Sequence, residues 1–143
     1  ALTGEVFALL RDHSILLRTG TGAGLHACDG DEGFIAGVKR SAHLPERLLG
    51  ALFEVRTAQL LRERSGPWAC GFLSGLLIGD ELAGMSATRP AFRDVKIIGD
   101  AQLAALYQRA FAERAVAARI IDGSDCAIAG LQQLYESVPE EAP

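Results

Sequence analysis

The stretch Val95-Lys96-Ile97-Ile98-Gly99-Asp100 decides the fold, because an apolar run ends there and a periodic segment begins. The apolar residues of that segment recur at the spacing of one helix face: Leu103, Leu106, Tyr107, Ala110 and Phe111. Asp100 is a residue type that caps helices, and Gly99 permits close approach of another backbone or a ligand. The stretch therefore predicts a strand followed directly by a helix.

A turn of this kind is a natural seat for a nucleotide. The first N–H groups of a helix lack intrahelical partners and the helix dipole is positive there, so a ribose or phosphate can bind without special side chains. Many α/β proteins contain similar turns. The turn at Gly99-Asp100 therefore predicts nucleotide binding only together with other features of the chain.

The rest of the chain reads as mostly helical. Helices are expected over residues 3–12, 32–42, 48–64, 68–85 and 125–137, and a second strand over 117–121. Thr3, Asp31 and Asp125 are the expected N-caps, Pro45 suits a first helical turn, and Ser65-Gly66-Pro67 separates two helices. Residues 19–30 are expected to form a flexible loop, 86–93 a second loop, and 138–143 a frayed tail.

Strand, helix and strand in succession form a βαβ unit, which requires a parallel sheet. Parallel sheets contain several strands with covered faces, yet only two strands are apparent. We expect the remaining strands to come from sequence before Ala1 or from another chain. Ala1 is not a start methionine, so the sequence reads as a piece of a longer protein. Expressed alone, it is expected to be poorly soluble or to form a homo-oligomer through the sheet edge.

Composition indicates a single globular domain of 143 residues with 49% hydrophobic and 22% charged residues. The net charge is -4 and the 14 Lys and Arg residues form no run, which gives no support for nucleic acid or acidic membrane partners. The longest apolar stretch, 72–78, is too short to span a bilayer. Cys28, Cys70 and Cys126 are odd in number and contain no CxxC, which favours a reducing compartment such as the cytoplasm over a disulfide framework.

Small residues recur every four positions in the segment around 72–82, at Gly71, Gly75, Gly79 and Ala83. Glycine inside a helix costs about 0.5 to 1 kcal/mol relative to alanine, so this smooth ridge needs a compensating contact. Close packing against a neighbouring helix or strand is the ordinary reason, and a flat ligand is the alternative. Both can hold at different turns of the helix.

Arg56 lies on a predicted apolar stripe formed by Leu49, Leu52, Phe53 and Leu60. An arginine drawn inward needs an anion. That anion is either a carboxylate or phosphate of a substrate, or an internal partner such as Glu54, Glu5 or an aspartate. The third possibility is that only the aliphatic part of Arg56 is buried.

Several site types lack the residues they require. The run of Gly20, Gly22 and Gly24 has no GK[ST] ending, and His13 and His43 have no ligand spacing to each other or to a cysteine. There is no GxSxG motif and no paired set of carboxylates. A dinucleotide-binding oxidoreductase is disfavoured because the turn after the first strand lacks GxGxxG.

Three segments together resemble a known family. They are Thr3-Gly4-Glu5 with residues 7–10 and 13–16, then Leu52-Phe53-Glu54-Val55-Arg56-Thr57, and then Phe72-Leu73-Ser74-Gly75-Leu76-Leu77-Ile78-Gly79-Asp80-Glu81. In order and spacing the chain resembles the C-terminal half of the 2-dehydro-3-deoxygalactonokinases nearly end to end, through residues 97–100, 106–107, 122–123 and 129–131. The segment 72–81 is the most specific.

This resemblance implies an α/β, helix-rich, ribonuclease-H-like C-terminal domain of the actin-like ATPase superfamily, with part of its sheet supplied by N-terminal sequence. The implied activity is transfer of phosphate from ATP, with Mg2+, to the 6-hydroxyl of the sugar acid 2-dehydro-3-deoxy-D-galactonate. In that superfamily the turn matching Gly99-Asp100 seats adenosine, the helix matching 72–82 lines the adenine side, and the helix holding Ala129-Gly130 connects two domains.

The implied roles assign nine candidate residues. Gly99, Asp100, Leu103, Ser74, Gly75 and Ile78 are the expected nucleotide contacts, and Thr3, Glu5 and Arg56 are the expected sugar-acid contacts. The family more often has a small residue where Asp100 stands, and a carboxylate repels phosphates, so Asp100 either contacts the ribose or only caps the helix.

No catalytic residue and no metal ligand are expected in residues 1–143. In this family the first phosphate loop, the acidic groups that hold magnesium and the catalytic carboxylate all precede the residue matching Ala1. Phosphoryl transfer depends on positioning and on neutralisation of charge, so the chain alone should be inactive. The alternative is a non-catalytic nucleotide- or ligand-binding module of the same superfamily, which would keep the adenosine turn and lose the transfer.

Overall fold

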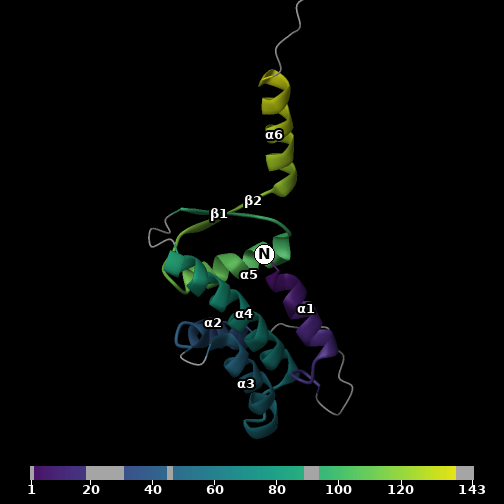
Figure 1. Ribbon diagram of the computed structural model, residues 1–143, viewed down its shortest axis with the longest axis vertical. Coiled ribbons are helices and arrows are strands. Elements are labelled where there is room, and N and C mark those ends of the chain that lie inside the picture. The colour runs from purple at the N-terminus through teal and green to yellow at the C-terminus, as the bar shows by residue number, and fades with distance from the viewer. Residues whose placement is uncertain (1, 19–30, 45–46, 89–93, 138–143) are drawn as a thin grey trace, which may run out of the picture.

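The computed structural model describes residues 2–18, 31–44, 47–88 and 94–137 (Figure 1). Along the chain lie α1 (Thr3–His13), α2 (Asp31–Ser41), α3 (Arg47–Leu61), α4 (Gly66–Thr88), β1 (Val95–Ile98), α5 (Ala101–Ala112), β2 (Ala118–Ile121) and α6 (Gly123–Ser137). This order confirms the expected succession of elements. The predictions for the loop 19–30, for Pro45 and for the tail 138–143 lie outside the described residues.

The long helix α4 is the centre of the helical region, and residues 69–79 are all buried. It packs backbone to backbone against α2. A Cβ atom added to Gly75 would overlap the carbonyl oxygen of Phe34, and one added to Gly37 of α2 would overlap the carbonyl oxygen of Phe72. A Cβ atom at Gly79 would overlap the Ser41 hydroxyl. The interpretation of the glycine ridge as a packing surface is therefore confirmed at Gly75 and Gly79.

Helix α3 turns a different face to the core from the one predicted. Leu49, Phe53 and Leu60 are 83%, 55% and 59% exposed, so the expected apolar stripe is wrong. The buried face instead carries small residues such as Ala51 and Val55, which share one core cluster with residues of α4. Small side chains let two helices approach closely, and this gain outweighs burial of the larger leucine face.

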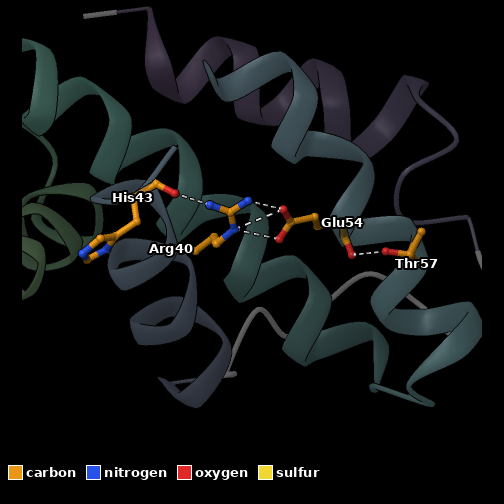
Figure 2. Close-up of polar contacts among 4 residues, drawn as sticks. All are labelled: Arg40, His43, Glu54 and Thr57. Carbon is orange, nitrogen blue, oxygen red and sulfur yellow. Dashed lines mark hydrogen bonds and ion pairs between the residues drawn. The ribbon is translucent and has the colours of Figure 1, made fainter. Parts of the chain in front are cut away.

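An ion pair fastens α3 to the end of α2 (Figure 2). The Nε atom of Arg40 lies 3.1 Å from both carboxylate oxygens of Glu54, and Nη2 lies 2.6 Å from Oε1. The guanidinium also donates to the carbonyl of His43, so it closes the C-terminal end of α2 as well. Within α3, the Thr57 hydroxyl donates to the Glu54 carbonyl at 3.2 Å.

The two strands are parallel neighbours, with Val95 opposite Ala118 and Ile98 opposite Ile121. Together with α5 they form the predicted βαβ unit. Val95 and Ile97 face the second core cluster, which includes Phe111 of α5. In Figure 1 the strands lie at one end of the molecule beside α5, and α6 projects away from the rest. No residue of α6 is buried.

The helix caps agree with the sequence at Asp100 and differ at Thr3 and Asp125, and Asp31, also an expected cap, is itself the first residue of α2. The carboxylate of Asp100 accepts from the backbone N–H groups at the start of α5, as predicted. Leu2, not Thr3, occupies the N-cap of α1 and makes no side-chain bond. At α6 the cap is Asp122, whose Oδ1 accepts from the N–H groups of Ser124 and Asp125 at 2.7 and 3.1 Å. Asp122 takes this role because β2 ends immediately before it, which leaves no room for a longer turn.

Helix α4 is longer than predicted at both ends. Gly66 and Pro67 begin the helix instead of separating it from α3, because proline fits the first helical turn, where its missing N–H costs nothing. At the other end α4 continues to Thr88, into the segment 86–93 that was expected to be a loop. The hydroxyl of Ser86 donates to the Leu82 carbonyl at 2.8 Å and so stays compatible with the helix.

The cysteines differ from expectation at one position. Cys126 is free, but Cys70, buried in α4, is disulfide-bonded. The prediction that the cysteines form no disulfide is therefore wrong for Cys70. None of the helices in the described residues combines the length and apolarity needed to cross a membrane.

Candidate functional site

A cleft of about 320 Å3 opens between α1, α4 and the start of α5. Four of the six expected nucleotide contacts line it, together with one expected sugar-acid contact: Ser74, Ile78, Asp100, Leu103 and Thr3. These residues come from segments as far apart in sequence as 3 and 103. The fold therefore brings most of the predicted nucleotide site into one place.

The turn before α5 holds Asp100 as a cap. Asp100 Oδ1 accepts from the N–H groups of Gln102 and Leu103 at 3.0 and 3.1 Å. Two of the N–H groups that were expected to hold an anion are therefore already bound to a carboxylate. A phosphate at this point would meet both an occupied donor pair and a negative charge. The geometry favours a neutral hydroxyl, such as that of a ribose, as the group that approaches Asp100.

The floor of the cleft is one face of α4. Gly71, Ser74 and Ile78 follow one another at spacings of three and four residues, which places them along one side of the helix. Ser74 is 8% exposed and is the buried polar side chain on this floor. Gly75, one turn after Gly71, packs against the Phe34 backbone and does not line the cleft. The contact of α4 with α2 at Gly75 and Gly79 thus adjoins the part of α4 that lines the cleft.

Two arginines that sequence reasoning missed stand at the cleft. The Arg109 guanidinium lies 5.2 Å from the centre of the Phe34 ring and 2.8 Å from the Asp31 carboxylate. Arg11 lies 5.7 Å from the centre of the Phe7 ring. All five of these side chains line the cleft. Arg109 continues the i+3 row of Leu103 and Leu106, and that periodicity was the only signal in the sequence.

The second arginine is also paired. Arg11 Nε lies 2.7 Å from Asp12 Oδ1, and this bond raises the pKa of Arg11 and lowers that of Asp12. Because Arg11 and Arg109 each balance a carboxylate, the cleft carries no large excess of positive charge. It is an apolar slot with paired charges at its edge.

A second cleft of about 330 Å3 runs along β1. All four residues of β1 line it, followed by Gly99, and its other wall includes Glu81 and Tyr107. Gly99 therefore borders this cleft and not the first. Three residues line both clefts, namely Gly4, Asp100 and Leu103. The first turn of α1 stands where the two clefts meet.

A carboxylate ties this junction together. Glu81 Oε2 accepts from the Thr3 hydroxyl at 2.5 Å and also from the Tyr107 hydroxyl. Burial, followed by the bond to Glu81, raises the pKa of Tyr107 to about 12. The phenol therefore remains a donor at neutral pH, and α1, α4 and α5 meet at one oxygen atom.

Two expected sugar-acid contacts lie elsewhere. Glu5 is exposed on α1 and lines neither cleft. Arg56 lies on α3 and its guanidinium donates to the carbonyl of Arg18, so the partner that the structure describes is a backbone carbonyl and not one of the carboxylates considered. Their roles stay predictions. Among the described residues no group of three or more His, Cys, Asp and Glu side chains could hold a metal ion.

Comparison with known proteins identifies the family of this chain. The model of the 2-keto-3-deoxy-galactonokinase family matches residues 1–134. A protein of Rhizobium meliloti (strain 1021) described as a probable 2-dehydro-3-deoxygalactonokinase is 33% identical over 137 residues, which are 96% of this chain and 44% of that protein. The 2-dehydro-3-deoxygalactonokinase of Escherichia coli (strain K12) is 32% identical over 138 residues, 96% of this chain and 45% of its own length.

A solved structure agrees with the sequence matches. The crystal structure of a protein from Sinorhizobium meliloti, assigned as a 2-dehydro-3-deoxygalactonokinase, superposes with a TM-score of 0.79 at 33% identity. The match covers 92% of this chain and 43% of that one. This chain thus spans less than half the length of the relatives that it matches. On the match over residues 1–134, the chain belongs to the 2-keto-3-deoxy-galactonokinase family.

Proposed function

We propose that this chain is the nucleotide-side part of a sugar-acid kinase that transfers the γ-phosphoryl group of ATP to the 6-hydroxyl of 2-dehydro-3-deoxy-D-galactonate. One observation carries the proposal. Ser74 and Ile78 of α4, Leu103 of α5 and the Asp100 turn line a single cleft, although they were expected at a nucleotide site for separate reasons. Membership of a family whose relatives are described as kinases supports the same reading.

The cleft suits an adenosine. Apolar side chains such as Ile78 and Leu103 offer flat contact to a base, and the Ser74 hydroxyl offers a hydrogen bond to its edge. Asp100 accepts the cap bonds through Oδ1, which leaves Oδ2 to accept from a ribose hydroxyl. Arg11 and Arg109 at the cleft are paired with Asp12 and Asp31, so most of the charge of the phosphates would be neutralised by groups outside this cleft.

We expect the transfer itself to depend on the part of the protein that this chain does not span. Mg2+ belongs to the proposed reaction, but no described group of side chains fits a metal ion, so its ligands are assigned to the part of the protein that this chain does not span. The general base for the sugar hydroxyl is assigned there too. The contribution of residues 2–137 is to bind the nucleotide and fix its orientation, which is a large share of catalysis in phosphoryl transfer.

The same proposal assigns the fold to a superfamily and explains its incomplete sheet. Two parallel strands with an exposed helix α6 are expected to belong to a ribonuclease-H-like domain of the actin-like ATPase superfamily. Strands from the part not spanned by this chain would complete the sheet, and α6 would connect the two domains. ATP and a small sugar acid as substrates favour the cytoplasm as the location.

Replacement of Gly99 tests the site in the full-length protein. A Cβ atom at Gly99 meets nothing within 4 Å, so Gly99→Val should fold normally. In a coupled assay of ADP release, we expect the variant to raise the KM for ATP more than the KM for the sugar acid, because Gly99 adjoins Asp100, which lines both clefts. An equal loss for both substrates would contradict the placement of the nucleotide at this turn.

ADP release and ATP binding, measured on the full-length wild-type protein, distinguish the kinase from a non-catalytic nucleotide-binding module. Release of ADP with one of several 2-keto-3-deoxy sugar acids supports the kinase. Binding of ATP without turnover on any of them would remove the kinase and support a non-catalytic nucleotide-binding module.

A further inference from the structure

Glu81 has a position that neither the nucleotide contacts nor the core packing explains. It lies on α4, lines the second cleft, and accepts two hydrogen bonds at the same oxygen atom, Oε2. The donors are Thr3, at the first turn of α1, and Tyr107, on α5. A single carboxylate oxygen thus joins three helices whose residues line the first cleft.

These bonds fix the place where the two clefts meet. Thr3 is followed by Gly4, where an added Cβ atom would lie 3.7 Å from Cδ2 of Leu103. Gly4 and Leu103 line both clefts. No residue of α1 is buried and its N-cap makes no side-chain bond, while Phe7 and Leu10 in its later turns pack against the core. Loss of the Glu81 bonds would therefore loosen the first turn of α1, where it borders the first cleft.

We propose that Glu81 is a positioning residue for the nucleotide cleft, holding the first turn of α1 against the first turns of α5 through Thr3 and Tyr107. This inference rests on the proposed function and adds to it a residue that does not touch the nucleotide. Hydrogen bonds to a charged acceptor are stronger than those between neutral groups, so the Glu81 carboxylate can hold both donors in place. The Tyr107 hydroxyl can donate to Glu81 because a phenol is protonated at neutral pH.

The test uses the full-length protein and a non-hydrolysable ATP analogue, with the Kd measured by calorimetry well below the melting temperature. Glu81→Ala removes both acceptor bonds and should raise the Kd about tenfold, equivalent to about 1.4 kcal/mol. Glu81→Gln keeps a side-chain oxygen that can accept both bonds and should restore most of the affinity. Tyr107→Phe removes one donor and should have an intermediate effect.

The matched control is Glu54→Ala. Glu54 also joins two helices through a carboxylate, with Arg40 at 2.6 Å, but lines neither cleft (Figure 2). It should lower the melting temperature and leave the Kd for the analogue unchanged. A merely structural role for Glu81 would give this same result in Glu81→Ala.

The outcomes separate the two proposals. An unchanged Kd in Glu81→Ala, with wild-type protein that binds the analogue, overturns the positioning role and leaves the proposed function standing. A wild-type protein that binds no analogue overturns both. Failure of Glu81→Gln to recover affinity, while Glu81→Ala loses it, would also contradict positioning by hydrogen bonds and would indicate an effect of charge.

Discussion

The α2 and α4 pair and the sheet with α6 differ in how completely each is packed. Between α2 and α4, Gly37 and Gly75 let the backbones touch, and the surrounding side chains are buried. At the other end, α6 has no buried residue, and its apolar side chains Ile128, Leu131 and Leu134 are 55% to 66% exposed. The packing surface of α4 is thus covered by α2 of the same chain, whereas the apolar surface of α6 is not covered by the described residues.

The difference agrees with the length of the chain relative to its family. The relatives are more than twice as long as the segment matched, so surface that is apolar here has more protein available to cover it. Large exposed apolar patches usually mark contact surfaces. The first cleft has its floor on α4 and its rim at Asp100, before α5.

The largest effect is expected where the packing is closest. Gly75→Val would force a side chain into the carbonyl oxygen of Phe34, which is backbone and cannot move aside, so we expect a loss of about 3 kcal/mol or more in the free energy of unfolding. Chemical denaturation of the full-length protein measures it.

Gly84 provides the control in the same helix. A Cβ atom there meets nothing within 4 Å, so Gly84→Ala should stabilise the protein by up to about 1 kcal/mol. A Gly75→Val variant as stable as the wild type would contradict the close packing of α2 on α4.

The next largest effect concerns the cap of α5. Asp100→Ala frees the N–H groups of Gln102 and Leu103 and should cost about 1 kcal/mol of stability. The same change at Asp122, which caps the unpacked α6, should cost no more, because fraying of a helix without tertiary contacts disrupts little else. Thermal denaturation compares the two variants, and a larger loss at Asp122 would indicate that α6 is packed in solution.

A pH dependence should separate Tyr107 from the exposed end of the molecule. Its pKa is raised from 10 to about 12 in the folded state, so its contribution to stability is present below pH 10 and is lost as the pH rises towards 12. After allowance for its partial exposure, we expect a loss of about 1 kcal/mol or less. Tyr107→Phe should remove that part of the decline in urea titrations from pH 9 to 11.5. Tyr135→Phe, at an 85% exposed ring on α6, should leave the decline unchanged.

The smallest effect on stability is expected on α6. Leu131→Asp replaces a side chain that is 66% exposed, so residues 1–143 alone should change by less than about 0.5 kcal/mol and become more soluble. In the full-length protein the same variant should lose more, since the surface would then be covered. Equal effects in both contexts, by denaturation, would contradict the view that α6 lacks its partner surface here.

The sequence predicted well the features that depend on local pattern. The strand, the cap at Asp100 and the βαβ order follow from periodicity and capping chemistry, and the structure confirms them. It failed at α3, where leucines suggested a core face but alanines and a valine made one, because which face is buried depends on the neighbouring helix. Periodicity alone also could not show that α4 has a glycine face for α2 and a second face for the cleft.

The site was predictable in part for the same reason. Ser74, Ile78, Asp100 and Leu103 carried a family resemblance or a turn signal, and they line one cleft. Arg109 carried no such signal, and Glu81 lay in the segment of resemblance without an expected role, because both roles arise from contacts between segments distant in sequence. The prediction that Arg56 lies on a buried stripe was wrong, because the periodicity of an isolated helix does not show which face meets the core.

Photolabelling most directly tests the central claim that this cleft seats the nucleotide. The full-length protein would be irradiated with 8-azido-ATP, with and without excess ATP, and the labelled peptides identified by mass spectrometry. We predict ATP-protected labelling in residues 71–78 or 100–106, which contain the residues of α4 and of the start of α5 that line the first cleft. Protected labelling confined to other parts of the protein would contradict the account.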